Sequence, residues 1–304
     1  MDALSQVLRA LRLTGTVYFR ANFSAPWGMK MQGGPFANFH LVVSGTCWVR
    51  HSKDSDAIEL RAGDLVLFPH GDTHSLVENP GTEADPAEAV LATEREDGST
   101  TVFGGDGPVT TTLLCGHFSY DRSGSHPLFS HLPAMLLVRS SQEANTWISV
   151  ATQLAELETK SDQYGSSASV DRLAEVLLIG VLRSYLESMD TPTGFLAALG
   201  DPGLCHVLLE IHNAPKEAWT VERAATIAGM SRSVFADRFR ANTGMTPMQY
   251  VTHFRLLHAK ELLLSSQASL AEIAADIGYQ SEFSFAKAFK KQFGSPPGQF
   301  RKSA

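Results

Sequence analysis

An internal duplication near the carboxyl end constrains this chain more than any other feature of its sequence. The segment "SRSVFADRFRANTGMTPMQY" (231–250) aligns without a gap with "SEFSFAKAFKKQFGSPPGQF" (281–300) at an offset of 50 residues. Just upstream, "VERAATIAGM" and "LAEIAADIGY" match at an offset of 49. Identical pairs in the longer alignment are Ser231/Ser281, Phe235/Phe285, Ala236/Ala286, Phe239/Phe289, Gly244/Gly294, Pro247/Pro297 and Gln249/Gln299. Such self-similarity predicts two copies of one supersecondary unit.

Each copy contains a short helix, a glycine and a second helix entered through a serine. The glycine, Gly229 or Gly278, can take the left-handed backbone conformation that ends a helix. The serine, Ser231 or Ser281, can cap the helix that follows. This arrangement predicts a helix-turn-helix, whose second helix can lie in a DNA major groove.

The phenylalanine spacing predicts which face of each second helix is buried. Phe235 and Phe239 are four residues apart, as are Phe285 and Phe289, so each pair belongs to one inner face. The opposite face is then left to contact DNA. Its predicted residues are Arg232, Ser233, Ala236, Asp237 and Arg240 in the first copy, and Glu282, Phe283, Ala286, Lys287 and Lys290 in the second.

The carboxyl-terminal hundred residues resemble the DNA-binding domain of AraC/XylS-type transcription regulators. The match covers about residues 200–302 and includes "ADIGYQSEFSFAKAFKKQFGSPPGQFR", which runs through that family's signature region. The resemblance implies double-stranded operator DNA as a partner. Asp237 departs from the family, which often places a basic or polar residue there; it either accepts from cytosine or weakens the first motif.

The segment between the copies, "PMQYVTHFRLLHAKELLLSS", predicts one long helix. About 17 helical residues span about 26 Å. A rod of that length can hold two recognition helices about one turn of B-DNA apart. Charge agrees weakly: residues 201–304 carry 12 Lys or Arg and 9 Asp or Glu in a chain of net charge -7. That excess is too small to decide anything alone.

The amino-terminal part predicts an all-β unit that resembles the cupin barrels. From Val17 to about Tyr120, short β-prone runs alternate with glycines and turns. "GDLVLFPHGDTH" matches the second cupin motif through Gly63, Pro69, Gly71 and His74. The stretch before "VVSG" supplies only His40 where the first motif needs more ligands, which disfavours dioxygenase or isomerase chemistry. Residues 82–107 are acidic and glycine-rich and predict a long loop.

Two interpretations fit the chemically active side chains of this unit. His40, His74 and Cys115 have the donor atoms of a tetrahedral zinc site, with Cys47 and His126 as further candidates. The alternative is a metal-free core or pocket in which the cysteines are small core residues. As a cupin-type sensor, the unit would hold a small-molecule effector; the residues predicted to line its pocket are Trp27, His40, Cys47, Phe68 and His74.

Two helices with apolar residues three and four apart follow, "NTWISVATQLAELE" and "SVDRLAEVLLIGVLRSYLES". The second carries more apolar residues than one face needs, which fits packing both on the β unit and on a second subunit, and fits burial inside one chain equally well. The predicted architecture is therefore α+β with two domains: a cupin-like barrel (1–135), a helical linker or dimerisation pair (136–194), and a double helix-turn-helix domain (195–304).

These features predict a transcription regulator, not an enzyme. We expect a homodimer that binds operator DNA under the control of a small effector and contacts RNA polymerase if it is an activator. No apolar run approaches a membrane span and the first residues lack an export signal, so we expect a cytoplasmic protein. The alternative hypotheses are a cupin metalloenzyme with a helical appendage, and a DNA-binding protein whose barrel is purely structural.

Overall fold

The chain forms two units that are described separately below. The computed structural model describes residues 2–10, 14–51, 56–93, 95–97, 100–119, 127–140, 146–159, 164–188 and 194–303. Backbone contacts group Thr14–Tyr120 with Leu132–Asp190, here called the strand unit. The helical unit comprises Met1–Leu13, Asp121–His131 and Thr191–Ala304. Most of segment 136–194 thus belongs to the same unit as the strands.

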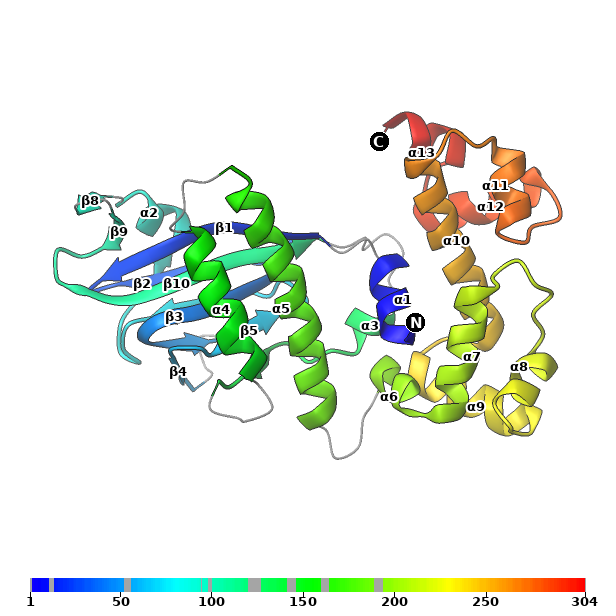
Figure 1. Ribbon diagram of the computed structural model, residues 1–304, viewed down its shortest axis with the longest axis horizontal. Coiled ribbons are helices and arrows are strands. Elements are labelled where there is room, and N and C mark those ends of the chain that lie inside the picture. Colours follow the sequence, from blue (N-terminus) through cyan, green and yellow to red (C-terminus); the bar gives the residue numbers. More distant parts are fainter. Residues whose placement is uncertain are drawn as a thin grey trace. The chain divides into compact units, whose positions relative to one another are not determined.

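The described part of the strand unit contains eleven strands (Figure 1). They run β7–β2–β6–β3–β10–β1–β9–β8, with β4 and β5 also pairing with β3, and β11 pairing with β5. Their bounds are β1 Thr14–Ser24, β2 Gly28–Met31, β3 Ala37–Arg50, β4 Ile58–Arg61, β5 Leu65–Phe68, β6 His74–Val77, β7 Asp85–Pro86, β8 Arg95–Asp97, β9 Thr100–Gly104, β10 Val109–Ser119 and β11 Leu136–Val138.

Strand β3 curls this sheet because it changes partners along its length. Its first part pairs with β10 and β5, and its second part, from Thr46 onward, pairs with β4 and β6. The change falls beside Gly45, whose φ of 79° favours glycine. A Cβ at Gly45 would also collide with the carbonyl oxygen of Thr110. The result is the curled half-barrel that the sequence predicts.

Apolar side chains fill the inner side of this half-barrel. The buried cluster draws on eight strands, β1 to β6, β9 and β10, and on α2 (Ala87–Leu91), which contributes Ala87 and Val90. The prediction of a loop over residues 82–107 was therefore wrong, since this segment contains β7, α2, β8 and β9. A five-residue helix with two buried positions is too short to leave a periodic signal.

Two long helices, α4 (Thr146–Thr159) and α5 (Ser166–Ser188), pack on each other and on the sheet (Figure 1). Gly180 leaves room for the indole ring of Trp147, because a Cβ there would overlap that ring. The carboxylate of Asp171 accepts a hydrogen bond from the backbone N–H of Val17 at 3.0 Å. The predicted helix pair is thus fixed to strand β1.

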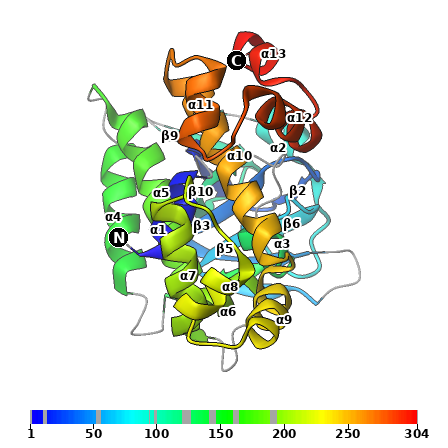
Figure 2. The same cartoon turned by 90° about the vertical axis from the view of Figure 1, so that its right-hand side faces the viewer.

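The described part of the helical unit is built from ten helices. They are α1 Ala3–Ala10, α3 Pro127–Ser130, α6 Gly194–Gly200, α7 Pro202–Asn213, α8 Val221–Ile227, α9 Arg232–Thr243, α10 Pro247–Ser265, α11 Leu270–Asp276, α12 Glu282–Phe293 and α13 Pro297–Ser303. Figures 1 and 2 show α8 and α9 beside one end of α10, and α11 and α12 beside the other end. The duplicated sequence therefore forms two like structures joined by a rod.

The predicted capping serines and turn glycines have the same roles in both copies. The hydroxyl oxygens of Ser231 and Ser281 accept from the backbone N–H three residues on, which caps α9 and α12. The turn glycines Gly229 and Gly278 have φ values of 65° and 81°. The helices α9 and α12 both end on a left-handed glycine. Local chemistry therefore sets the same helix boundaries twice.

The bend at Gly45 is open to a direct test. We expect Gly45→Ala to lower the free energy of unfolding of the strand unit by about 2 kcal/mol or more, because it combines a positive φ with a steric clash. Gly34→Ala is the matched control, since its Cβ would meet nothing within 4 Å. Urea unfolding followed by circular dichroism measures both. Equal stability of the two variants would contradict this role for Gly45.

Candidate nucleic-acid interface and cavity

Helix α9 buries one face and exposes the other, as predicted. The rings of Phe235 and Phe239 are fully buried, with centroids 5.5 Å apart. The ring of Phe239 also meets Tyr250 of α10 edge-on at 5.6 Å. The residues predicted to contact DNA are exposed or, for Ala236, half-buried: Arg232, Ser233, Ala236, Asp237 and Arg240.

Helix α12 repeats this division with a different outer face. Phe285 and Phe289 are fully buried, and Phe289 also contacts Phe293 and Phe300. Phe283, by contrast, is 79% exposed, which is unusual for an aromatic side chain with no pocket to fill. The remaining predicted residues, Glu282, Lys287 and Lys290, are exposed, while Ala286 is half-buried.

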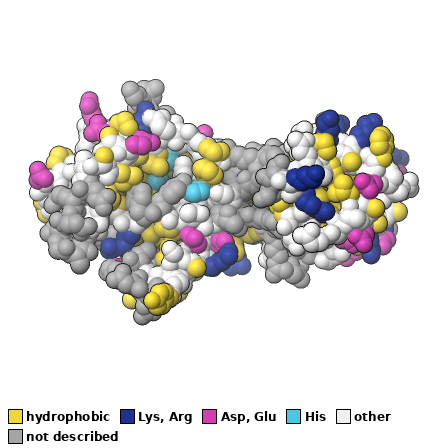
Figure 3. Space-filling model, turned by 90° about the horizontal axis from the view of Figure 1, so that it is seen from above, with side chains coloured by type: hydrophobic (Ala, Val, Ile, Leu, Met, Phe, Trp, Pro, Cys, Tyr) yellow, Lys and Arg dark blue, Asp and Glu magenta, His cyan; other side chains and the backbone are white. Residues whose placement is uncertain are grey.

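Ion pairs fix the first motif, whereas the cations of the second are free of carboxylates. The Nε of Arg232 lies 2.9 Å from Glu222 of α8, and Arg238 lies 2.6 Å from Asp201, the cap of α7. Within the described residues, Lys287 and Lys290 have no ion-pair partner within 4 Å. Figure 3 shows Lys and Arg side chains gathered on the visible face of the helical unit. The second motif therefore presents the less compensated positive charge.

Helix α10 holds the two motifs at a fixed separation. A reciprocal capping box of Thr246 and Gln249 starts it, and its 19 residues span about 28 Å. Arg255 donates to the carbonyl oxygens of Pro215 and Glu217, and Arg301 donates to those of Leu263 and Ala268. These bonds tie the middle of the rod and its carboxyl end to neighbouring segments, which supports a defined spacing of the two motifs.

In the strand unit, the structure brings together His40, His74 and Cys115, the three predicted zinc ligands. The Nδ1 of His40 lies 3.1 Å from the sulfur of Cys115, and its Nε2 lies 2.7 Å from the Nε2 of His74. The Nδ1 of His74 contacts the carbonyl oxygen of Asp72 at 2.7 Å. His40 thus uses its two nitrogens on opposite ring edges. The three side chains form a linear hydrogen-bonded chain and do not converge on one point.

This geometry does not favour a metal centre. Among the residues that the structure describes, no group of three or more His, Cys, Asp or Glu side chains is placed to hold a metal ion. His126, a further candidate ligand, lies outside the described residues. Tetrahedral zinc needs donors that point inward from four directions. The sequence identified the right neighbours but not the direction of their lone pairs.

Burial keeps this hydrogen-bonded chain neutral. Burial, with the nearby His74, lowers the pKa of His40 well below its usual range. Burial lowers the pKa of His74 to about 4, although the hydrogen bond that its Nδ1 donates to the carbonyl oxygen of Asp72 acts in the opposite direction. Burial likewise raises the pKa of the Cys47 thiol to about 12 and that of Cys115 as well. At neutral pH both imidazoles are therefore uncharged and both thiols keep their protons.

The other residues predicted to line a pocket lie in packed surroundings. Trp27 stacks on Phe23 with a centroid distance of 4.3 Å, and Phe68 stacks on His74 at 3.7 Å. Trp27, Cys47 and Phe68 all belong to the buried cluster inside the half-barrel.

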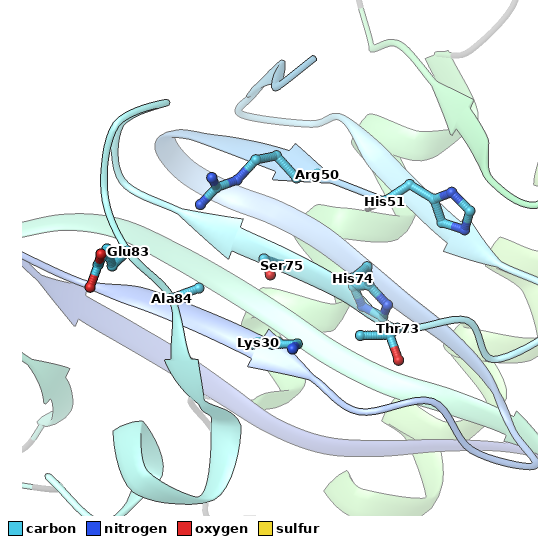
Figure 4. A pocket seen from close by; sticks show the side chains of 8 residues that line it. All are labelled: Lys30, Arg50, His51, Thr73, His74, Ser75, Glu83 and Ala84. Carbon is cyan, nitrogen blue, oxygen red and sulfur yellow. The ribbon is translucent and has the colours of Figure 1, made fainter. Parts of the chain in front are cut away.

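A cavity of about 650 Å³ opens elsewhere on the strand unit (Figure 4). Of the five predicted pocket residues, only His74 borders it. The others that line it are Lys30, Arg50, His51, Thr73, Ser75, Glu83 and Ala84. Sequence reasoning missed them because they come from β2, β3, β6 and the segment before β7, with no shared motif. The signal that could have identified Arg50 is the alternation along β3, in which Val49 is buried and Arg50 is not.

A membrane-spanning segment was also considered. Within the described residues no single helix is long and apolar enough to cross a membrane; α6 and α7 pass that test only as a pair bent by 97°.

Comparison with known proteins adds independent evidence. A cupin family model matches residues 2–187, and a helix-turn-helix domain model matches residues 224–303. The chain is 30% identical over 303 residues to a putative AraC-like transcription regulator of Streptomyces lividans, covering 99% of this chain and 98% of that protein. A similar protein of Streptomyces antibioticus is 31% identical, with 99% of each chain covered.

Two further similarities extend these findings. The HTH-type transcriptional regulator AlkR of Acinetobacter baylyi is 29% identical over the full length of both chains. Among solved structures, the DNA-binding domain of AdpA in complex with a target DNA is 35% identical, covering 34% of this chain and 92% of that one, with a TM-score of 0.32.

The neutral state of His74 predicts a pH dependence. The unfolded imidazole takes up a proton near pH 6.5, whereas the folded one does so near 4, so the unfolded state binds more protons between these values. Above pH 6.5 the neutral His74 makes its full contribution to the free energy of unfolding. That contribution falls by about 3 kcal/mol as the pH drops to 4. His74→Gln should remove this part of the slope in urea unfolding curves. An NMR titration in which His74 ionises near 6.5 would contradict the assignment.

Proposed function

The chain belongs to the AraC-like transcription regulators that join a cupin domain to a helix-turn-helix domain, and from this premise we propose that both motifs bind one operator while a small molecule in the strand unit controls that binding. The observation that carries the proposal is the duplicated motif with its buried phenylalanine pairs. Because each pair faces inward, each helix turns its other face toward DNA.

The geometry of the helical unit supports simultaneous binding of two major grooves. The rod α10 spans about 28 Å, close to the roughly 34 Å of one DNA turn. Successive major grooves on one side of a duplex are one turn apart. The shortfall between rod and turn favours a bend of the DNA toward the protein. We propose that one subunit contacts two successive grooves of a bent operator.

The two motifs differ in how they would recognise DNA. In α12, Lys287 and Lys290 are exposed and have no carboxylate partner among the described residues, which suits contacts with phosphates. The exposed ring of Phe283 suits an apolar contact with the methyl group of thymine. In α9, Glu222 orients the guanidinium of Arg232, and Asp237 suits the amino group of cytosine. The unequal faces favour an operator with two unlike halves.

A gel-shift assay with the DNA upstream of the chain's own gene tests DNA binding. We expect specific binding that weakens with salt, and we expect Lys287→Ala to reduce affinity several-fold and the salt slope by about 0.9, since one phosphate contact is lost. Arg172→Ala is the matched control: it removes an exposed cation from the strand unit and should leave binding unchanged. Equal binding by both variants would remove Lys287 from the interface.

The surface of α4 supports a homodimer. Val150, Leu154 and Leu157 lie on one stripe of this helix and are 54%, 46% and 68% exposed. Val176 of the adjacent helix α5 is 50% exposed. An apolar stripe along a helix pair is self-complementary in a twofold dimer. We propose that a second copy of the chain covers it.

Light scattering of the purified protein tests this dimer. Leu154→Glu should give monomers at concentrations where the wild type is dimeric, because pairing would bury an unpaired carboxylate. Val109→Glu is the matched control, since Val109 is 45% exposed on β10 and lies outside the stripe. A Leu154→Glu protein that remains dimeric would exclude this face as the interface.

Further parts of the proposal concern partners and location. We propose that the protein acts in the cytoplasm without catalytic activity, and that as an activator it would contact RNA polymerase from the bound operator. The hydrogen bonds of His40 with both His74 and Cys115 support a non-catalytic role for these three side chains, because they use both ring nitrogens of His40. We do not extend the proposal to a cupin metalloenzyme, for which the first motif lacks ligands.

A further inference from the structure

The cavity of the strand unit lies across three neighbouring strands. The backbone register pairs Ser75 of β6 with Lys30 of β2 on one side and with Arg50 of β3 on the other. The next row, Leu76 with its two partners, belongs to the buried cluster. Since side chains alternate across a sheet, the row of Lys30, Ser75 and Arg50 faces away from the core. The cavity is therefore built on the outer side of the half-barrel.

Its two principal cations are not neutralised. Arg50 donates from Nη2 to the carbonyl oxygen of Thr82 at 2.8 Å, but its Nε is buried and has no hydrogen-bond partner among the described residues. In the part of the chain that the structure describes, neither Arg50 nor Lys30 has an ion-pair partner within 4 Å. The one carboxylate in the lining is the exposed Glu83. A buried donor without an acceptor is rare, and here it belongs to a side chain that lines an open volume.

Hydroxyl groups complete the set of donors. The oxygen of Thr73 accepts from the backbone N–H of Gly33 at 2.9 Å, which leaves its own proton free to donate. Ser75 places a second hydroxyl between the two cations, as Figure 4 shows. A guanidinium, an ammonium and two hydroxyls are the donors that proteins use for phosphate and carboxylate groups. The volume of about 650 Å³ is that of a small-molecule site.

We propose that this outer cavity, and not the interior of the half-barrel, binds the effector through an anionic group, a phosphate or a carboxylate held by Arg50 and Lys30. This inference rests on the proposed function, because it names the chemical class of the controlling molecule. The exposed Glu83 on the opposite wall would accept from a hydroxyl or amine on the same ligand. The effector is then a polar anion and not a hydrocarbon.

Arg50 also connects a bound anion to another segment of the strand unit through hydrogen bonds. Its guanidinium holds the segment before β7 through the carbonyl oxygen of Thr82. The backbone N–H of Glu78 in the same segment donates to the carbonyl oxygen of Trp27 at 3.1 Å. An anion bound to the Nε of Arg50 would be connected through this side chain both to strand β3, which carries Arg50, and to the segment that contains Thr82.

Isothermal titration of the full-length protein tests the inference. The probes are inorganic phosphate, glycerol 3-phosphate and succinate, each at constant ionic strength in a chloride buffer. We expect saturable binding of at least one probe, weakened tenfold or more in both Arg50→Met and Lys30→Met. Arg61→Met is the matched control: Arg61 is an exposed cation of β4 that pairs with Glu59, and its loss should not alter binding. Tighter binding of the phosphate probes would identify the anionic group as a phosphate, and tighter binding of succinate would identify it as a carboxylate.

Two outcomes overturn the inference: no saturable binding of any probe to the wild type, or unchanged binding in the variants. Circular dichroism first checks that Arg50→Met is folded; if it is not, Lys30→Met decides. The gel shift separates this inference from the proposed function. Specific DNA binding without anion binding removes only the anion site, whereas loss of specific DNA binding in the wild type removes the proposed function.

Discussion

The burial of two phenylalanines one helical turn apart decides what each recognition helix presents to its surroundings. Phe235 and Phe239 in α9, and Phe285 and Phe289 in α12, are fully removed from solvent. Fixing two positions on a helix fixes the direction of all the others, because the helix is rigid. The same aromatic anchors also attach α9 to Tyr250 of α10. Orientation of the recognition face and its connection to the rod therefore depend on one set of contacts.

The two motifs share these buried phenylalanine pairs, but their exposed surfaces differ. Ion pairs with Glu222 and Asp201 restrain the arginines of the first motif, and such restraint lowers the entropy lost when they meet a fixed acceptor. Lys287 and Lys290 of the second motif have no such partners within the part of the chain that the structure describes. Restrained arginines suit base recognition, and lysines without such partners suit phosphate contacts. Duplication thus gave one scaffold two recognition chemistries.

In the strand unit, dense packing removes the expected interior site. The hydrogen-bonded chain of Cys115, His40 and His74 is satisfied from within, and aromatic rings cover its flanks. A buried network whose hydrogen bonds are all made stabilises the core and leaves few donors or acceptors for a ligand. On the opposite face of the sheet, the buried Nε of Arg50 has no acceptor among the residues that the structure describes. The histidines of the cupin motif serve here in packing.

The sequence by itself determined the duplicated motifs, their capping serines, their turn glycines and the outward residues of α9 and α12. All of these depend on helix periodicity and on contacts within a few residues, which a sequence displays directly. Only the tertiary structure decided that His40, His74 and Cys115 form a line, and that the cavity lies outside the half-barrel. Lys30, Arg50 and Ser75 become neighbours through strand register, and register is set by hydrogen bonds between segments far apart in the chain.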